Sequence, residues 1–119
     1  MSYPEHMQTL GFSPEDYDNR FNGLDFLYAE CMELYIQSNQ IENLRSFFAA
    51  GDFKRAAEAA HALKGSSGNL ALMEMNQLYS QITIVLLGEN PMDAAPLISR
   101  VSALERELRK AAVLDGYIS

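Results

Sequence analysis

Apolar residues recur at steps of three and four along most of this 119-residue chain, and this spacing limits its possible folds more than any other feature. A repeat of about 3.6 residues places side chains on one face of an α-helix. No segment alternates polar and apolar residues as a half-buried strand does, and we interpret the apolar run 82–87 as buried helix. The chain is therefore expected to be all-α. The clearest periodic run consists of Leu24, Leu27, Tyr28, Cys31, Leu34, Tyr35, Ile41, Leu44, Phe47 and Phe48.

Helix-starting and helix-ending residues divide the chain into segments. Ser13 is a good N-cap and Pro14 a good first residue for a short helix, and Asp52 can cap a later one. Long helices with short connections bury their apolar faces best side by side. We therefore expect an antiparallel up-and-down four-helix bundle with a short extra N-terminal helix. The expected helices cover residues 13–22, 24–51, 52–69, 70–87 and 92–114, with an interruption or bend at 68–69.

The expected domain organisation is one bundle over residues 13–119. Residues 1–12 have no sustained period, and we interpret them as an N-terminal arm or a short packing segment. They also lack the basic and then apolar layout of a secretory signal, so a cytoplasmic protein is expected. Nothing in the sequence calls for an oligomer, and we expect a monomer.

Composition argues against several kinds of partner and site. Sixteen acidic and nine basic residues give a formal charge of −7, and no face is rich enough in Lys and Arg to bind nucleic acid. The longest uncharged run, 75–88, is too short and too polar to span a membrane. The single cysteine, Cys31, excludes an internal disulfide and is expected to be a small buried apolar residue. His6 and His61 are far apart in sequence and neither has a second metal ligand nearby, so no metal site is expected.

A nucleotide site is also missing from the sequence. The clustered glycines Gly65 and Gly68 lie within a helical pattern and not in a phosphate-binding loop after a strand. We therefore expect the protein to depend on chemistry that a partner supplies.

One helical face around His61 carries the residues that could perform such chemistry. At about 100° per residue, His61 shares this face with Ala57, Glu58, Lys64 and Gly65. Imidazoles titrate near pH 6.5, so an exposed histidine is mostly neutral and nucleophilic at pH 7. Lys64 could offset the charge of an incoming phosphoryl group, while Gly65 and Ala57 leave room for a partner. The opposite face is expected to be the core stripe, with Ala56, Ala59, Leu63 and Leu70.

The segment around His61 resembles a known family. The run AHALKGSS at 60–67 and LAL at 70–72 resemble the signature of histidine-containing phosphotransfer (HPt) domains. The similarity extends through AAGDF at 49–53 and over the helical layout from about 21 to 114. The resemblance implies a four-helix bundle whose exposed histidine accepts a phosphoryl group from an aspartyl phosphate on a receiver domain. The histidine then passes the group to another receiver aspartate.

The resemblance also implies roles for individual residues and partners. His61 would be the phosphoryl acceptor and Lys64 its charge partner, in a phosphocarrier without autonomous catalysis and without a cofactor. Magnesium would belong to the partner, which would be a response-regulator receiver domain or a hybrid histidine kinase. The expected receiver-docking face comprises Gly65, Ala57, Glu58 and Gly68.

Two positions depart from the pattern of the family. Many members have glycine where this chain has Ala71, so we expect a slightly wider helix crossing there. Many also use Gln or Glu on the next helix to orient the imidazole, and here the comparable turn offers the hydroxyls of Ser80 and Thr83. Two other functions stay open at this point: a non-catalytic interaction bundle that binds a receiver or a histidine kinase, and, much less favoured, a metal-dependent hydrolase.

Overall fold

The structure is a computed structural model that describes residues 5–118, and within this range the chain is helical. One isolated β-bridge, between Phe12 and Leu72, is the only strand-like pairing in that range. The expectation of an all-α fold is therefore confirmed. The elements in chain order are η1 (Glu5–Leu10), α1 (Pro14–Phe21), α2 (Asp25–Ser38), α3 (Gln40–Ala49), α4 (Phe53–Asn69), α5 (Met73–Leu86), η2 (Pro91–Ala94) and α6 (Ala95–Leu114).

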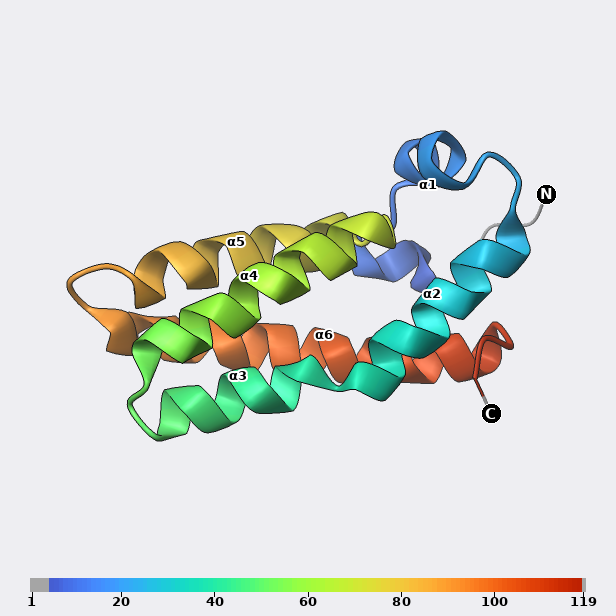
Figure 1. Cartoon of the computed structure of the whole chain (residues 1–119). Coiled ribbons are helices and arrows are strands. Elements are labelled where there is room, and N and C mark those ends of the chain that lie inside the picture. The colour runs from blue at the N-terminus through green and yellow to red at the C-terminus, as the bar shows by residue number, and fades with distance from the viewer. Residues whose placement is uncertain (1–4, 119) are drawn as a thin grey trace.

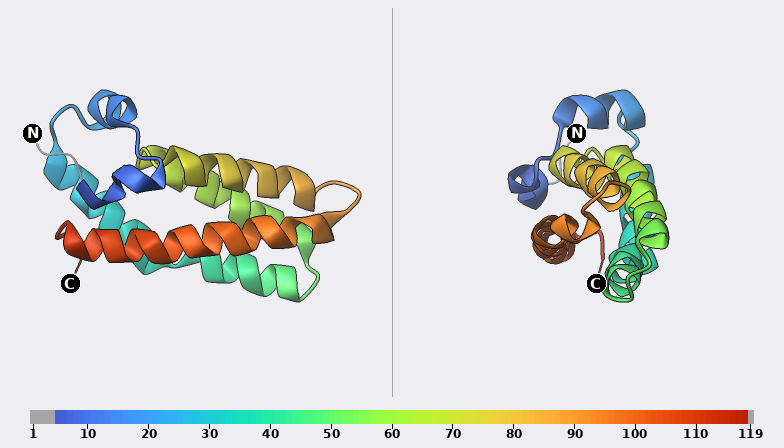
Figure 2. Two further views of the ribbon diagram at one scale, coloured as in Figure 1. Left: turned by 180° about the vertical axis from the view of Figure 1, so that it is seen from behind. Right: turned by 90° about the vertical axis from the view of Figure 1, so that its left-hand side faces the viewer.

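Four rods form an up-and-down bundle in a molecule that measures 46 × 27 × 20 Å (Figure 1). Helices α2 and α3 follow each other along one side and together make the first rod, and α4, α5 and α6 make the other three. Figure 2 shows that η1 and α1 lie at the same end of the bundle as the start of α2 and the end of α6. None of the helices within residues 5–118 is both long enough and apolar enough to cross a bilayer.

The expected single helix over 24–51 is wrong, because the chain breaks at Asn39. Asn39 has φ 48° and ψ 39°, the left-handed conformation, and separates α2 from α3. Asparagine tolerates this conformation better than most residues, so a local backbone preference interrupts an apolar pattern that continues on both sides. The other boundaries differ less: α4 ends at Asn69 as expected, and 3₁₀ helix η2 precedes α6.

Helix α5 begins at Met73 and not at residue 70, because 70–72 form the connection after α4. Ala71 has φ 60° there, and its carbonyl accepts a hydrogen bond of 2.8 Å from the Ser13 amide. The Met73 amide in turn donates to the Gly11 carbonyl at 3.1 Å. The N-terminal segment therefore holds the α4–α5 connection in place.

Residues 5–12 pack against the bundle. Met7, Leu10 and Phe12 are buried, and η1 lies against α6. The His6 ring bonds to the Asp115 carboxylate, which raises the pKa of His6 above its ordinary value of 6.5. Of the two interpretations of the N-terminal segment, the packing segment is therefore the right one for residues 5–12, and residues 1–4 lie outside the described part.

A polar cluster lies inside the apolar core between the first, third and fourth rods. The hydroxyls of Tyr35 and Tyr79 donate to the same oxygen, Oε1 of Glu105, at 2.5 and 2.7 Å. Tyr79 is fully buried and Tyr35 is 8% exposed. Glu105 therefore provides the hydrogen-bond acceptor that each of the two buried hydroxyls needs. Cys31 is half-buried at the edge of the core and not fully buried as expected.

Candidate functional site

Helix α4 carries the candidate site and is fixed on two sides by neighbouring helices. It begins after Asp52, whose carboxylate accepts the Arg55 amide at 3.2 Å. It packs against α3 on one side and against α5 on the other. Its buried residues are mostly small, which allows both neighbours to approach closely. They are Ala56, Ala57, Ala60, Leu63, Ser67 and Gly68.

His61 is exposed on the outer face of α4, as the sequence predicts. Lys54, Glu58 and Gly65 are also exposed, and all three lie within about 60° of His61 around the helix. The His61 ring makes no hydrogen bond and no ion pair with any residue of the range 5–118. Its nitrogens are therefore accessible to a partner molecule.

The space next to His61 is open at Gly65. A Cβ built on Gly65 would meet no atom within 4 Å, so glycine is not required there by the packing of the bundle itself. A glycine in mid-helix costs about 1 kcal/mol relative to alanine. The reason for this glycine therefore lies outside the isolated bundle, which agrees with the sequence interpretation of Gly65 as a clearance position.

Lys64 is half-buried at the border between the outer face of α4 and α5. Its ammonium group forms no ion pair with another residue of the described chain. Its carbonyl, in contrast, accepts hydrogen bonds from the Ser67 hydroxyl at 3.2 Å and from Asn76 Nδ2 at 2.8 Å. The backbone of Lys64 is thus fixed by α5, while its charge is available beside His61.

Two residues expected on the docking face are buried, and the expectation is wrong for both. Ala57 is 3% exposed, and Gly68 is buried. A Cβ on Gly68 would lie 3.0 Å from Nδ2 of Asn76, so Gly68 admits the α5 side chain that bonds to Lys64. The sequence analysis placed the core on one side of α4, but the packing of α5 widens the buried face toward His61. Glu58 and Gly65 remain exposed on the face where they were expected.

The expected orientation of the imidazole by hydroxyls of α5 is not formed. The Thr83 hydroxyl donates to the carbonyl of Tyr79 at 2.8 Å, one turn back on its own helix, as threonines in helices often do. Ser80 is half-buried, and neither hydroxyl bonds to the His61 ring in the range 5–118. No hydrogen bond from residues 5–118 therefore orients the ring.

Ala71 departs from the family pattern at a position with an unusual backbone conformation. It lies in the α4–α5 connection with φ 60°, where glycine is favoured because it has no Cβ. An alanine in this conformation costs about 1–2 kcal/mol. The departure from glycine at this position therefore strains the turn between α4 and α5.

Sequence reasoning missed two residues of α5 near the site. Asn76 had no signal in the sequence, because its role depends on the close approach of α5 to Gly68. Since α4 and α5 are antiparallel, the residue eight places after Asn76 is level with the residue eight places before Gly68. Asn76 also bonds to Lys64, so Ile84, which is 69% exposed, is level with the part of α4 between Ala56 and Ala60, just before His61. Its exposure was missed because Ile84 lies within the apolar run 82–87, which we interpreted as buried helix.

The arrangement presents an accessible imidazole, a lysine one turn away and an open helix surface on a rigid bundle. It offers a nucleophile and a positive charge to a group that arrives from outside.

In the comparisons with known proteins, the family model of the Hpt domain matches residues 28–113. The match begins in α2 and ends in α6, so it includes all four rods and His61. No curated protein and no solved structure matches the chain. The match covers most of the chain, which therefore belongs to the Hpt domain family, whose members serve histidine phosphotransfer in two-component signalling.

Proposed function

We propose that this protein is a phosphorelay intermediate in which His61 accepts a phosphoryl group from an aspartyl phosphate of a receiver domain. His61 then passes the group to the aspartate of another receiver. The observation that carries the proposal is the exposure of His61 on α4 of an Hpt-family bundle, next to open space at Gly65. The partners are a response-regulator receiver domain, a hybrid histidine kinase, or both, and the protein acts as a monomer.

The proposed reaction moves one phosphoryl group and leaves the bundle otherwise unchanged. A ring nitrogen of neutral His61 attacks phosphorus, a P–N bond forms, and the P–O bond to the aspartate breaks. The aspartate leaves as a carboxylate, and the ring carries a proton on its other nitrogen. Lys64 offsets the charge on the phosphoryl oxygens during the transfer. Magnesium is held by the receiver, and the protein needs no cofactor of its own.

The proposed docking surface includes fewer residues of α4 than the sequence predicts, and it adds one exposed residue of α5. It comprises Glu58 and Gly65 around His61, together with Ile84, which is exposed near the same level. An exposed apolar side chain next to an open helix face suits an apolar patch on a partner. The buried residues Ala57 and Gly68 support this surface from within and do not touch the partner.

The test is incubation with a phosphorylated receiver of the same organism in the presence of Mg²⁺. The protein should acquire a label that is labile in acid and stable in base. The His61→Gln variant should acquire none, while His6→Gln should be labelled like the wild type. An undiminished label in His61→Gln would overturn the proposal. A protein that binds the receiver tightly but takes no label would instead be a non-catalytic interaction bundle.

Lys64→Ala is expected to slow the transfer at least about tenfold, because the variant loses the positive charge next to the phosphoryl oxygens. The bundle should stay folded, since the ammonium group has no partner within the described chain. Stopped-flow transfer rates and thermal melts would measure both effects. Lys54→Ala, on the same face but two turns from His61, is the matched control and should transfer at nearly the wild-type rate. A large drop in melting temperature for Lys64→Ala would contradict the placement of this side chain.

A further inference from the structure

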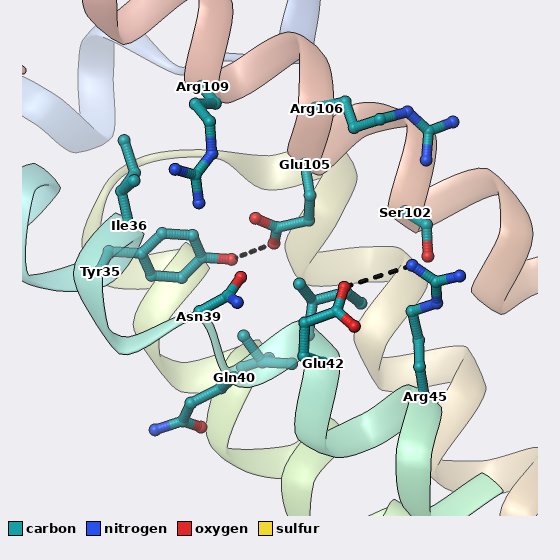
Figure 3. Close-up of a pocket in the computed structure, with 12 residues that line it drawn as sticks. Tyr35, Ile36, Asn39, Gln40, Glu42, Arg45, Ser102, Glu105, Arg106 and Arg109 are labelled. Atoms are coloured by element: carbon teal, nitrogen blue, oxygen red, sulfur yellow. Dashed lines mark hydrogen bonds and ion pairs between the residues drawn. The ribbon is translucent and has the colours of Figure 1, made fainter. Parts of the chain in front are cut away.

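A second site candidate lies away from the exposed face of α4. A cavity of about 320 Å³ opens between the α2–α3 break and α6 (Figure 3). Its volume falls within the usual range for sites of small molecules. Asn39, the residue of the break, lies at its edge, and α6 supplies Ser102, Glu105, Arg106 and Arg109. The cavity therefore lies where the first rod is interrupted at Asn39.

The walls of this cavity carry more positive than negative charge. Three arginines, Arg45, Arg106 and Arg109, and two glutamates, Glu42 and Glu105, line it. Arg45 is paired with Glu42 at 3.2 Å. Arg106 and Arg109 form no hydrogen bond and no ion pair within residues 5–118. The cavity therefore carries a surplus of one positive charge in a chain whose net charge is −7.

Ser102 adds an independent observation in the same cavity. Ser102 is 8% exposed. Its hydroxyl oxygen is buried and has no hydrogen-bond partner among residues 5–118. Figure 3 shows the hydroxyl turned toward the side of the cavity where Arg45 lies. A buried hydroxyl without a partner costs about 1–3 kcal/mol. An oxygen of a ligand in the cavity would remove this cost.

Glu105 is the one carboxylate of the cavity without an arginine bonded to it. Its Oε1 already accepts two hydrogen bonds, from Tyr35 and Tyr79, which compensate part of its charge. Burial raises the pKa of this carboxyl, and the two hydroxyls and the nearby charge of Arg109 oppose that rise. Figure 3 shows Arg109 reaching from α6 alongside Tyr35 and Glu105. The guanidinium groups of Arg106 and Arg109 thus keep their donors for another anion.

We propose that this cavity binds a small organic or inorganic anion with a carboxylate or phosphate group. Arg106 and Arg109 supply charge-assisted hydrogen bonds, and the hydroxyl of Ser102 donates a further one. The site does not depend on phosphotransfer at His61, which lies on a different face of α4. It would add a small-molecule input to the phosphotransfer protein.

The test is a titration of the ¹⁵N-labelled full chain with inorganic phosphate and, separately, with succinate, at constant ionic strength. The amides of Asn39, Ser102 and Arg109 should shift and saturate with at least one of the two anions. The anion that binds more tightly identifies the preferred group. Arg106→Gln/Arg109→Gln should weaken binding at least about tenfold, and Ser102→Ala should weaken it less.

Two controls keep the result specific to this cavity. Lys110→Gln removes one positive charge from α6, next to Arg109 but outside the cavity, and should change affinity less than about twofold. His61→Gln should bind like the wild type, so a failed relay would leave this result unaffected. Shifts that never saturate for either anion would overturn the proposal, and so would a loss in Lys110→Gln as large as that in the double variant. Thermal melts of each variant confirm that the folded bundle is compared.

Discussion

Gly65→Gln is expected to slow phosphotransfer from a receiver at least tenfold while the bundle becomes no less stable. The position is exposed, one turn beyond His61, and nothing lies within 4 Å of a Cβ built there. The glutamine therefore fits the isolated protein and improves helix propensity by roughly 0.5–1 kcal/mol. In the complex, its side chain would occupy space that the receiver needs, and small misplacements of reacting groups cost up to about 10²-fold in rate. Transfer rates and chemical denaturation of the same variant separate the two effects.

Two further variants sharpen this prediction. Gly65→Ala should gain about 1 kcal/mol in the free energy of unfolding and keep most of the transfer rate, because a methyl group is small. Ala103→Gln places the same side chain on an exposed position of α6, far from the proposed docking surface, and should transfer normally. Unchanged affinity of Gly65→Gln for the receiver would show that this face is not the docking surface.

Glu105→Ala is expected to lower the free energy of unfolding by about 4 kcal/mol, the largest stability effect expected from a polar residue of the described chain. The change strands the buried hydroxyls of Tyr35 and Tyr79, and each stranded buried group costs about 1–3 kcal/mol. The matched control is Glu107→Ala, two positions away and exposed, which should change stability by less than about 0.5 kcal/mol. Urea denaturation measures both variants.

A combined variant tests the cause. Tyr35→Phe/Tyr79→Phe in the Glu105→Ala background removes the stranded hydroxyls and should recover part of the loss. If the triple variant were as unstable as the sum of the separate changes, the hydroxyls would not be coupled to Glu105. That result would contradict the role of this cluster.

The pH dependence of stability gives a second readout of Glu105. Burial raises the pKa of this carboxyl above its ordinary value of 4.5, so the folded state holds the proton more tightly than the unfolded state. Its contribution to stability is therefore full below about pH 4.5 and falls as the pH rises through the folded pKa. Glu105→Gln removes this titration. The stability of Glu105→Gln relative to wild type should therefore increase with pH across that window and then become constant.

The sequence predicts those parts of the fold that depend on local signals. The cap at Asp52, the helix start at Ser13 and the end of α4 at Asn69 are all confirmed, because each depends on neighbouring residues. The break at Asn39 was missed because the apolar spacing continues through it, and only the left-handed backbone of one residue interrupts the helix. The packing of residues 5–12 was left open because it depends on contacts with α6 and the α4–α5 connection.

The sequence predicts those features of the candidate site that depend only on the position of a residue around α4. The exposure of His61, Glu58 and Gly65 follows from their positions around α4. The burial of Ala57 and Gly68 does not, because it depends on how far α5 extends around that helix. The cluster of Tyr35, Tyr79 and Glu105 also joins three distant parts of the chain, which no local pattern reveals.

The most direct test of the central claim is to locate the phosphoryl group on the wild-type protein after transfer from a receiver. Mass spectrometry of peptides prepared at neutral to alkaline pH can do this, since phosphohistidine survives there. The chain contains two histidines, so His6 serves as an internal control. We predict one phosphoryl group per chain, on the peptide with His61 and on that histidine. A phosphoryl group on His6, or on any residue other than His61, would contradict the account.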